Sequence, residues 1–175
     1  MVPVYFDTSV FLCVLGKQPQ AAQVRDLLSE LKVDKVRIYT SILTVQEVSV
    51  SSFINGGLFV DYHSKLARLA RIKGVTKDIS LTAAKYEAAI IGAASKGKPK
   101  DEQERIRDNR RRKFDCFHLA TAVALGCSDF YAFDDKFETR CQLLDIKMRV
   151  REPRPQKPTL PGLIGLAPGG PVAGG

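Results

Sequence analysis

The 175-residue sequence has few of the residues that build zinc centres and disulfide frameworks. It contains two histidines, His63 and His118, and four cysteines with no Cys-x-x-Cys pair among them. Zinc sites and disulfide-stapled domains need closely spaced sets of such residues. We therefore interpret the cysteines as reduced core residues. His118 lies one helical turn after Asp115, so it could neighbour a metal, but a packed or surface histidine is the favoured interpretation.

Long apolar runs and an N-terminal leader are also missing. No apolar stretch approaches the roughly 20 residues that a membrane-spanning helix needs, and no Lys or Arg precedes Lys17. A secretory leader would begin with basic residues and continue as an apolar run. We therefore expect a cytoplasmic protein with no membrane partner. A glycine-rich loop after the first strand is absent too, which disfavours P-loop and dinucleotide-binding enzymes.

Positive charge, by contrast, is in excess and unevenly spread. The formal net charge is +8, with 27 Lys and Arg against 19 Asp and Glu. Residues 96–113 contain nine basic and four acidic residues and include the run Arg110, Arg111, Arg112 and Lys113. A concentrated basic stretch favours a polyanionic partner such as RNA. A solvated helix face is the alternative, because acids at 101, 102 and 104 precede Arg105 and Arg107 at pairing distance.

Apolar periodicity predicts short strands alternating with helices. We expect strands at 2–6, 36–40, 75–79, 130–133 and 146–150, and helices at 20–31, 41–54, 61–73, 82–95, 114–125 and 136–144. Such alternation is typical of an α/β fold, here a three-layer α/β/α arrangement with a mainly parallel central sheet. The predicted domain covers 1–150 with a basic insertion at about 96–113, and 151–175 is expected to be a disordered tail rich in Pro and Gly.

Four acids stand where this fold would bring them together. Asp7 and Asp134 end two predicted strands, Glu47 lies near the start of the helix that follows the second strand, and Asp115 lies in the first turn of the helix at 114–125. Parallel strands joined by right-handed crossovers end at a common edge of the sheet, where ligands bind in open α/β folds. Convergence of the four carboxylates is therefore expected. Taken alone, Asp7 could simply cap a turn or helix.

Converging carboxylates repel one another unless a cation neutralises them. An acid cluster without His or Cys partners favours hard divalent ions such as Mg²⁺ or Mn²⁺. These ions can activate water and neutralise charge on a phosphodiester. Combined with the basic stretch, the acids indicate a metal-dependent nuclease.

The motifs also resemble a known family. Asp7-Thr8-Ser9 after a strand, Glu47 within 41–48, Asp115 at the start of an apolar helix, and Asp134 nineteen residues later are together similar to a PIN domain of the VapC-like toxin type. The resemblance covers about residues 2–150. It implies a PIN-like fold and an endoribonuclease that uses Mg²⁺ or Mn²⁺. In many members a cognate antitoxin holds the enzyme inactive, and a homodimer is a further family expectation.

The resemblance also implies roles for individual residues. Asp7 and Asp115 would be the main metal ligands, with Asp134 completing the cluster, and Glu47 would bind metal through water or position the attacking water. The hydroxyl of Thr8 or Ser9 would orient substrate or the Asp7 carboxylate. Three features depart from the family pattern. Ala132 replaces a frequent Thr, Asp135 adjoins Asp134 as an alternative ligand, and the basic insertion and the tail rich in Pro and Gly are not part of a minimal toxin of this kind. A PIN-like RNA-binding or assembly module that has lost cleavage is the competing interpretation.

Overall fold

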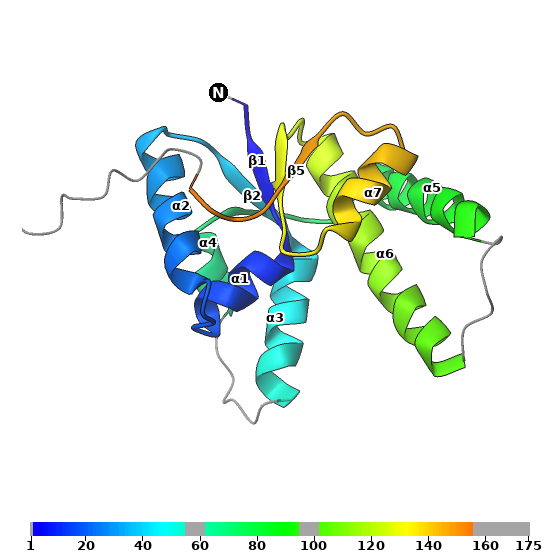
Figure 1. Ribbon diagram of the computed structural model, residues 1–175, viewed down its shortest axis with the longest axis horizontal. Helices are drawn as coiled ribbons and strands as arrows, with labels where there is room; N and C mark the ends of the chain where they lie inside the picture. The colour runs from blue at the N-terminus through cyan, green and yellow to red at the C-terminus, as the bar shows by residue number, and fades with distance from the viewer. Residues whose placement is uncertain (1, 55–61, 95–101, 156–175) are drawn as a thin grey trace, which may run out of the picture.

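The computed structural model describes residues 2–54, 62–94 and 102–155, and its centre is a five-stranded sheet (Figure 1). The strand order is β3-β2-β1-β4-β5, and every pairing is parallel. The strands are β1 (Val4–Phe6), β2 (Ile38–Ser41), β3 (Arg71–Lys73), β4 (Asp129–Tyr131) and β5 (Arg149–Arg151). The helices are α1 (Thr8–Leu15), α2 (Ala21–Val33), α3 (Ile42–Ile54), α4 (Tyr62–Ala67), α5 (Lys77–Ala94), α6 (Glu102–Ala124) and α7 (Lys136–Leu143).

Hydrophobic core residues lie on both faces of the sheet, because successive side chains of a strand point to opposite sides. Val4 and Phe6 of β1 pack with α1, α2 and α4, whereas Tyr5 between them packs with α6 and α7. All three β1 side chains are buried, as expected for a central strand covered on both faces. The predicted three-layer α/β/α fold with a parallel central sheet is therefore confirmed.

The predicted strand at 75–79 is wrong, and so is the second half of the predicted helix at 61–73. Helix α4 ends at Ala67, and Arg71–Lys73 forms the edge strand β3, which pairs Ile72 with Thr40 of β2. Residues 77–79 instead begin α5. An edge strand is covered on fewer sides than a central one, so β3 can alternate polar and apolar residues and shows no apolar run that marks it as a strand.

Helix α6 corrects one further prediction. It runs without a break from Glu102 to Ala124, so the described part of the predicted basic insertion, residues 102–113, is helical and continuous with the core helix. Asp115 consequently lies in the middle of a helix and not in its first turn, where the helix dipole would favour its charge. Residues 102–113 contain no Gly or Pro, and the apolar pattern begins only where the helix reaches the other core elements.

The remaining predicted elements agree with the structure to within a few residues. The predicted boundary at 150 falls inside β5, and the predicted tail from 156 onward lies outside the described residues, as do 96–101. Within the described ranges, no helix is both long enough and apolar enough to cross a membrane.

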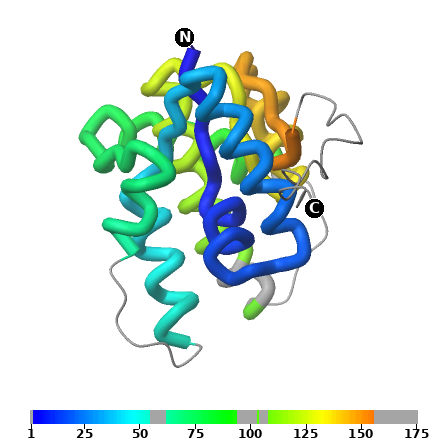
Figure 2. The backbone as a smooth tube through the Cα atoms, turned by 90° about the vertical axis from the view of Figure 1, so that its left-hand side faces the viewer, coloured from blue at the N-terminus to red at the C-terminus, as the bar shows by residue number. Residues whose placement is uncertain are grey.

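The carboxyl ends of the strands lie on one edge of the sheet. Figure 2 shows β1 leading directly into α1 at this edge. Helix α3 and the first half of α6 both project beyond the sheet on the same side (Figure 1). The predicted acids Asp7 and Glu47 therefore come from elements that follow directly on strand ends, and Asp115 comes from a helix that passes the same edge.

Candidate active site

Asp7 is held at the junction of β1 and α1. Its backbone N–H donates to the carbonyl oxygen of Tyr131 at 3.0 Å, which ties the end of β1 to β4. Its carboxylate oxygen Oδ2 accepts a hydrogen bond from the N–H of Ser9 at 3.0 Å, so Asp7 is the N-cap of α1. The residue is only 7% exposed. Asp7 therefore caps α1, as the sequence suggested, and its other carboxylate oxygen lies near His118.

Glu47 reaches this centre from the second turn of α3 and meets a buried histidine. The Nε2–H of His118 donates to Glu47 Oε2 at 3.0 Å, and the other ring nitrogen, Nδ1, is hydrogen-bonded to the Tyr5 hydroxyl at 2.7 Å. Asp7 Oδ1 lies 4.0 Å from His118 Nε2. His118 is 1% exposed. It therefore links two of the predicted catalytic acids to the core strand β1.

Hydroxyl groups complete the support of Glu47. The Thr8 hydroxyl donates to Glu47 Oε2 and also lies 3.1 Å from the Thr44 hydroxyl. Thr44 is hydrogen-bonded to Thr40 at 2.8 Å, and Thr40 donates to the carbonyl oxygen of Phe6 at 2.9 Å. This chain of hydrogen bonds joins α1, α3, β2 and β1 and fixes one oxygen of the Glu47 carboxylate.

The charges of Glu47 and His118 stabilise each other. Burial acts to raise the pKa of Glu47, but the hydrogen bonds and charge of His118, with help from Thr8, outweigh it and lower that pKa. Burial acts to lower the pKa of His118, but the hydrogen bond to Glu47 and the charge of Asp7 raise it overall. A carboxylate beside an imidazolium is the ionisation state that these opposite shifts favour.

Asp115 enters the site from α6, one turn before His118. Its carboxylate forms an ion pair with Arg140 of α7, and both side chains are mostly buried. Burial raises the pKa of Asp115 to about 6, with the nearby charge of Asp7 adding to the rise while Arg140 and His118 oppose it. The carboxyl groups of Asp115 and Asp7 are therefore close enough to repel each other.

Asp134 and Asp135 occupy the loop between β4 and α7, and both are exposed. Asp134 Oδ1 accepts a hydrogen bond from the N–H of Lys136 at 3.0 Å, at the start of α7. Ser9 Oγ accepts from the N–H of Phe133 at 3.3 Å and so ties this loop to α1. The structure groups Asp7, Glu47 and Asp115 around His118. Asp134 and Asp135 lie on the exposed loop after β4, the strand that pairs with β1.

The site has suitable donor atoms for a divalent ion, but its side chains are not arranged around one. Its donors are carboxylate oxygens, which Mg²⁺ and Mn²⁺ prefer. Within the described ranges, however, no three His, Cys, Asp or Glu side chains are arranged closely enough to hold a metal. Two of the acids already have cationic partners, Arg140 for Asp115 and His118 for Glu47. The donor chemistry fits, and the side chains would have to turn toward a shared ion.

The basic run of α6 divides into two kinds of residue. Arg110, Arg111 and Lys113 are exposed. Arg112 instead points toward α5: its guanidinium donates to Asn109 Oδ1 at 2.8 Å and lies 3.7 Å from Glu87. The two interpretations of this run, a solvated helix face and a binding surface for a polyanion, therefore apply to Arg110, Arg111 and Lys113. Arg112 also contributes to the packing of α6 against α5.

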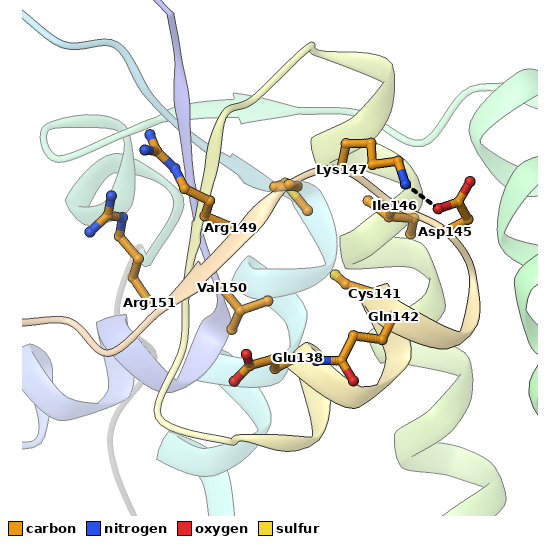
Figure 3. Close-up of a pocket in the computed structure, with 10 residues that line it drawn as sticks. Glu138, Cys141, Gln142, Asp145, Ile146, Lys147, Arg149, Val150 and Arg151 are labelled. Atoms are coloured by element: carbon orange, nitrogen blue, oxygen red, sulfur yellow. Dashed lines mark hydrogen bonds and ion pairs between the residues drawn. The ribbon is translucent and has the colours of Figure 1, made fainter.

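Two hollows lie in very different places relative to the acids. A hollow of about 600 Å³ between α7 and β5 is lined by Glu138, Cys141, Val150 and their neighbours, and none of the predicted catalytic acids reaches it (Figure 3). A groove of about 430 Å³ between α1, α3 and α6 is lined by Thr8 and Glu47 among others. The groove therefore adjoins the candidate active site.

Comparison with known proteins identifies the class to which this fold and site belong. The family model for the PIN domain matches residues 4–142, and the chain belongs to this family. Comparison with curated proteins gives no match. Among solved structures, the chain is similar to Mycobacterium tuberculosis VapC20, a sarcin-ricin loop cleaving toxin, with 16% identity and a TM-score of 0.53, covering 78% of this chain and 93% of that one.

A second similar structure is VapBC-1 from nontypeable Haemophilus influenzae. It shows 15% identity and a TM-score of 0.55, covering 87% of this chain and 98% of that chain. At these identities the two structures establish the shared fold. The PIN-like architecture predicted from the sequence is thereby confirmed.

Sequence reasoning undervalued two residues of the site. His118 follows Asp115 by three positions, so both lie on the same face of one helix, and that spacing was the available signal. Arg140 gave no comparable signal, because it lies 25 residues from Asp115 and only the packing of α7 against α6 brings them together.

Proposed function

We propose that this chain is a metal-dependent endoribonuclease that hydrolyses RNA phosphodiester bonds and acts as the toxin of a toxin–antitoxin pair. The observation that carries the proposal is the gathering of three mostly buried acids, Asp7, Glu47 and Asp115, at the carboxyl edge of the sheet of a PIN domain. The similarity to VapC20 and VapBC-1 supports the toxin assignment. An antitoxin protein is the partner that it implies, and a homodimer is a further expectation.

The proposed roles follow from where each side chain is held. Asp7 and Asp115 would hold Mg²⁺ or Mn²⁺, with Asp134, or Asp135 beside it, completing the ligand set from the loop after β4. Such an ion, when bound, lowers the pKa of a coordinated water and offsets charge on the scissile phosphate. Glu47, fixed by Thr8 and His118, would orient the attacking water and accept its proton. The water oxygen bonds to phosphorus as the bond to the leaving oxygen breaks, and that oxygen takes up a proton.

Ser9 and Thr8 have supporting roles in this proposal. Ser9 positions the loop that carries Asp134, through its contact with the N–H of Phe133. Thr8 holds the Glu47 carboxylate in one orientation, which a positioned general base requires. Neither hydroxyl needs to contact RNA in order to act in this way.

A second candidate function is a PIN-like RNA-binding or assembly module without cleavage. It is favoured by one observation: Asp115 and Glu47 already have cationic partners within the chain. A metal-binding function requires Asp115 to exchange Arg140 for the ion. A non-catalytic module requires no such change.

Cleavage of a mixed panel of single-stranded and hairpin RNAs, in Mn²⁺, Mg²⁺ or EDTA, tests the proposal. We expect metal-dependent cutting by the parent chain and its loss in Asp7→Asn and Asp115→Asn. Asp145→Asn is the matched control: Asp145 is exposed, pairs with Lys147 and has a φ of 51°, which Asn tolerates well. This variant should cut like the parent.

Thermal melting supplies a readout that does not depend on activity. A bound ion stabilises the folded state by mass action, by about 2.7 kcal/mol at 100 times its Kd. Mn²⁺ should therefore raise the Tm of the parent and of Asp145→Asn but not that of Asp7→Asn. An unchanged Tm together with RNA binding and no cutting would support the non-catalytic module instead.

A further inference from the structure

The groove between α1, α3 and α6 has an apolar lining although it opens beside the acids. Its volume is about 430 Å³, and its apolar walls come from all three helices: Leu12 from α1, Val50 and Ile54 from α3, and Phe114 from α6. Glu47 and Thr8 line it as well, so the groove and the candidate active site share a wall. A ligand in the groove would lie directly beside the carboxylates.

The apolar side chains on α3 remain in contact with solvent. Val50 is 44% exposed and Ile54 is 79% exposed, and they lie one helical turn apart. Exposed apolar side chains that cluster in a concave surface usually mark a binding site, whereas single exposed apolar residues are common and need no such explanation. The polar side chains of Gln46 and Ser51 also reach the groove. They provide hydrogen-bonding groups within an otherwise apolar lining.

The aromatic wall of the groove is flanked by cations. Arg110 and Arg111 precede Phe114 by four and three positions on α6, so the three side chains share one side of the helix. Both arginines are exposed. Arg112 is turned toward Asn109 and Glu87. An aromatic ring next to exposed cations is the combination that single-stranded nucleic acid binds, through stacked bases and neutralised phosphates.

From these observations we propose that the groove holds one unpaired nucleobase of single-stranded RNA, stacked on Phe114, next to the phosphate at the acid site. Arg110 and Arg111 contact the backbone on the side of the base away from the acids. A base in a duplex has both faces covered by its neighbours, so this groove selects an unpaired nucleotide. The inference deepens the proposed ribonuclease function and rests on it, because it places the scissile phosphate at Asp7, Glu47 and Asp115.

RNA is favoured over a protein segment by the walls that the groove shares. Glu47 and Thr8 line it, and two exposed arginines lie within about one helical turn of its Phe114 on α6. A phosphodiester chain would place its negative charge at the arginines and its reacting phosphate at the acids. An apolar helix of a partner protein would use the apolar walls and leave this charge pattern without a role.

Equilibrium binding in EDTA separates this inference from catalysis. The full chain carrying Asp7→Asn serves as parent and binds a fluorescent single-stranded RNA octamer, or the same octamer in a duplex. Further copies carry Phe114→Ala, Phe114→Leu or Phe114→Tyr. Phe53→Ala is the matched control, because Phe53 is a 55% exposed aromatic residue on α3 that does not line the groove.

We expect the parent to prefer the single strand, and Phe114→Ala and Phe114→Leu to weaken its binding about 5- to 150-fold, the usual loss when one stacked base loses its aromatic partner. Phe114→Tyr and Phe53→Ala should bind like the parent, and all variants should show parent-like unfolding midpoints. A 2-aminopurine base placed at successive positions should be quenched at one position, and the quenching should disappear in Phe114→Leu.

Two results would overturn the inference. Equal RNA affinity of the parent and Phe114→Ala would show that the groove holds no base and would leave a partner protein as its occupant. An equal loss in Phe53→Ala would show a general effect of exposed aromatic residues. If the chain with Asp7 intact cuts no RNA with Mn²⁺ while the Asp7→Asn parent stacks a base on Phe114, the base site is kept and the proposed nuclease is refuted, so the two failures are distinguishable.

Discussion

At the scale of single residues, His118 decides how the site is held together. It connects the Tyr5 hydroxyl in the core to the Glu47 carboxylate at the edge of the groove. A buried polar group that loses its partner costs about 1–3 kcal/mol. Removing the imidazole takes one hydrogen-bond partner from each of two groups, the Tyr5 hydroxyl and the Glu47 carboxylate, whereas removing the Tyr5 hydroxyl takes a partner from one group, Nδ1 of His118.

We therefore expect His118→Leu to lower the free energy of unfolding by clearly more than Tyr5→Phe, which should cost about 1 kcal/mol. Urea denaturation of both variants and of the double variant measures the difference. The double variant should be less destabilised than the sum of the two single ones, because the residues contact each other. Additive losses would contradict the linked network described here.

At the scale of elements, Asp129 joins the last two strands. Its carboxylate accepts hydrogen bonds from Ser128 and from Arg149 and Arg151 of β5, and the side chain is 8% exposed. Burial acts to raise the pKa of Asp129, but these hydrogen bonds and the charge of Arg151 lower it overall. A carboxyl group whose pKa is lower in the folded state stabilises the protein above its unfolded pKa of about 3.9, and this contribution disappears as the pH falls through the folded pKa.

Asp129→Asn should accordingly destabilise the chain at neutral pH by about 1.5–3 kcal/mol, the range for hydrogen bonds to a charged group. The gap between parent and variant should shrink as the pH drops below about 4. Urea unfolding at a series of pH values checks this, with Asp145→Asn as the control because Asp145 pairs with Lys147 at an exposed position. A gap that stays constant with pH would show that the charge of Asp129 is not what stabilises the strands.

The elements also show how far the sequence alone could predict this fold. Strands β1 and β4 were recognisable because they are central and buried, so their apolar runs follow directly from their position. The edge strand β3 was not, since its pairing with β2 is a long-range contact without a local pattern. The site residues differ in predictability for the same reason. Asp7 and Glu47 follow strand ends in the sequence, so they could be predicted from it. The pairing of Asp115 with Arg140 depends on how two helices pack, which no local pattern shows.

At the scale of the whole molecule, the positive charge of +8 has more than one surface on which it could act. One is the exposed part of the basic run on α6, beside the groove. Another is a hollow of about 480 Å³ between α2, α4 and the sheet, whose lining includes Arg37, Arg68 and Arg71. The salt dependence of RNA binding distinguishes the two, because each cation that neutralises a phosphate of a single strand contributes about 0.7 to the slope of log K against log salt.

Neutralising Arg110 and Arg111 together, as Arg110→Gln with Arg111→Gln, should reduce that slope by about 1.4 if both contact phosphates. Arg112→Gln is the matched control, because Arg112 is partnered by Asn109 and Glu87 and should leave the slope near that of the parent. Fluorescence anisotropy with one RNA octamer at four salt concentrations measures all three proteins. Suppose that the slope is unchanged in the double variant but falls when Arg68 and Arg71 are neutralised. RNA would then bind at the opposite end of the strands. The groove beside the acids would lie off the path of the RNA.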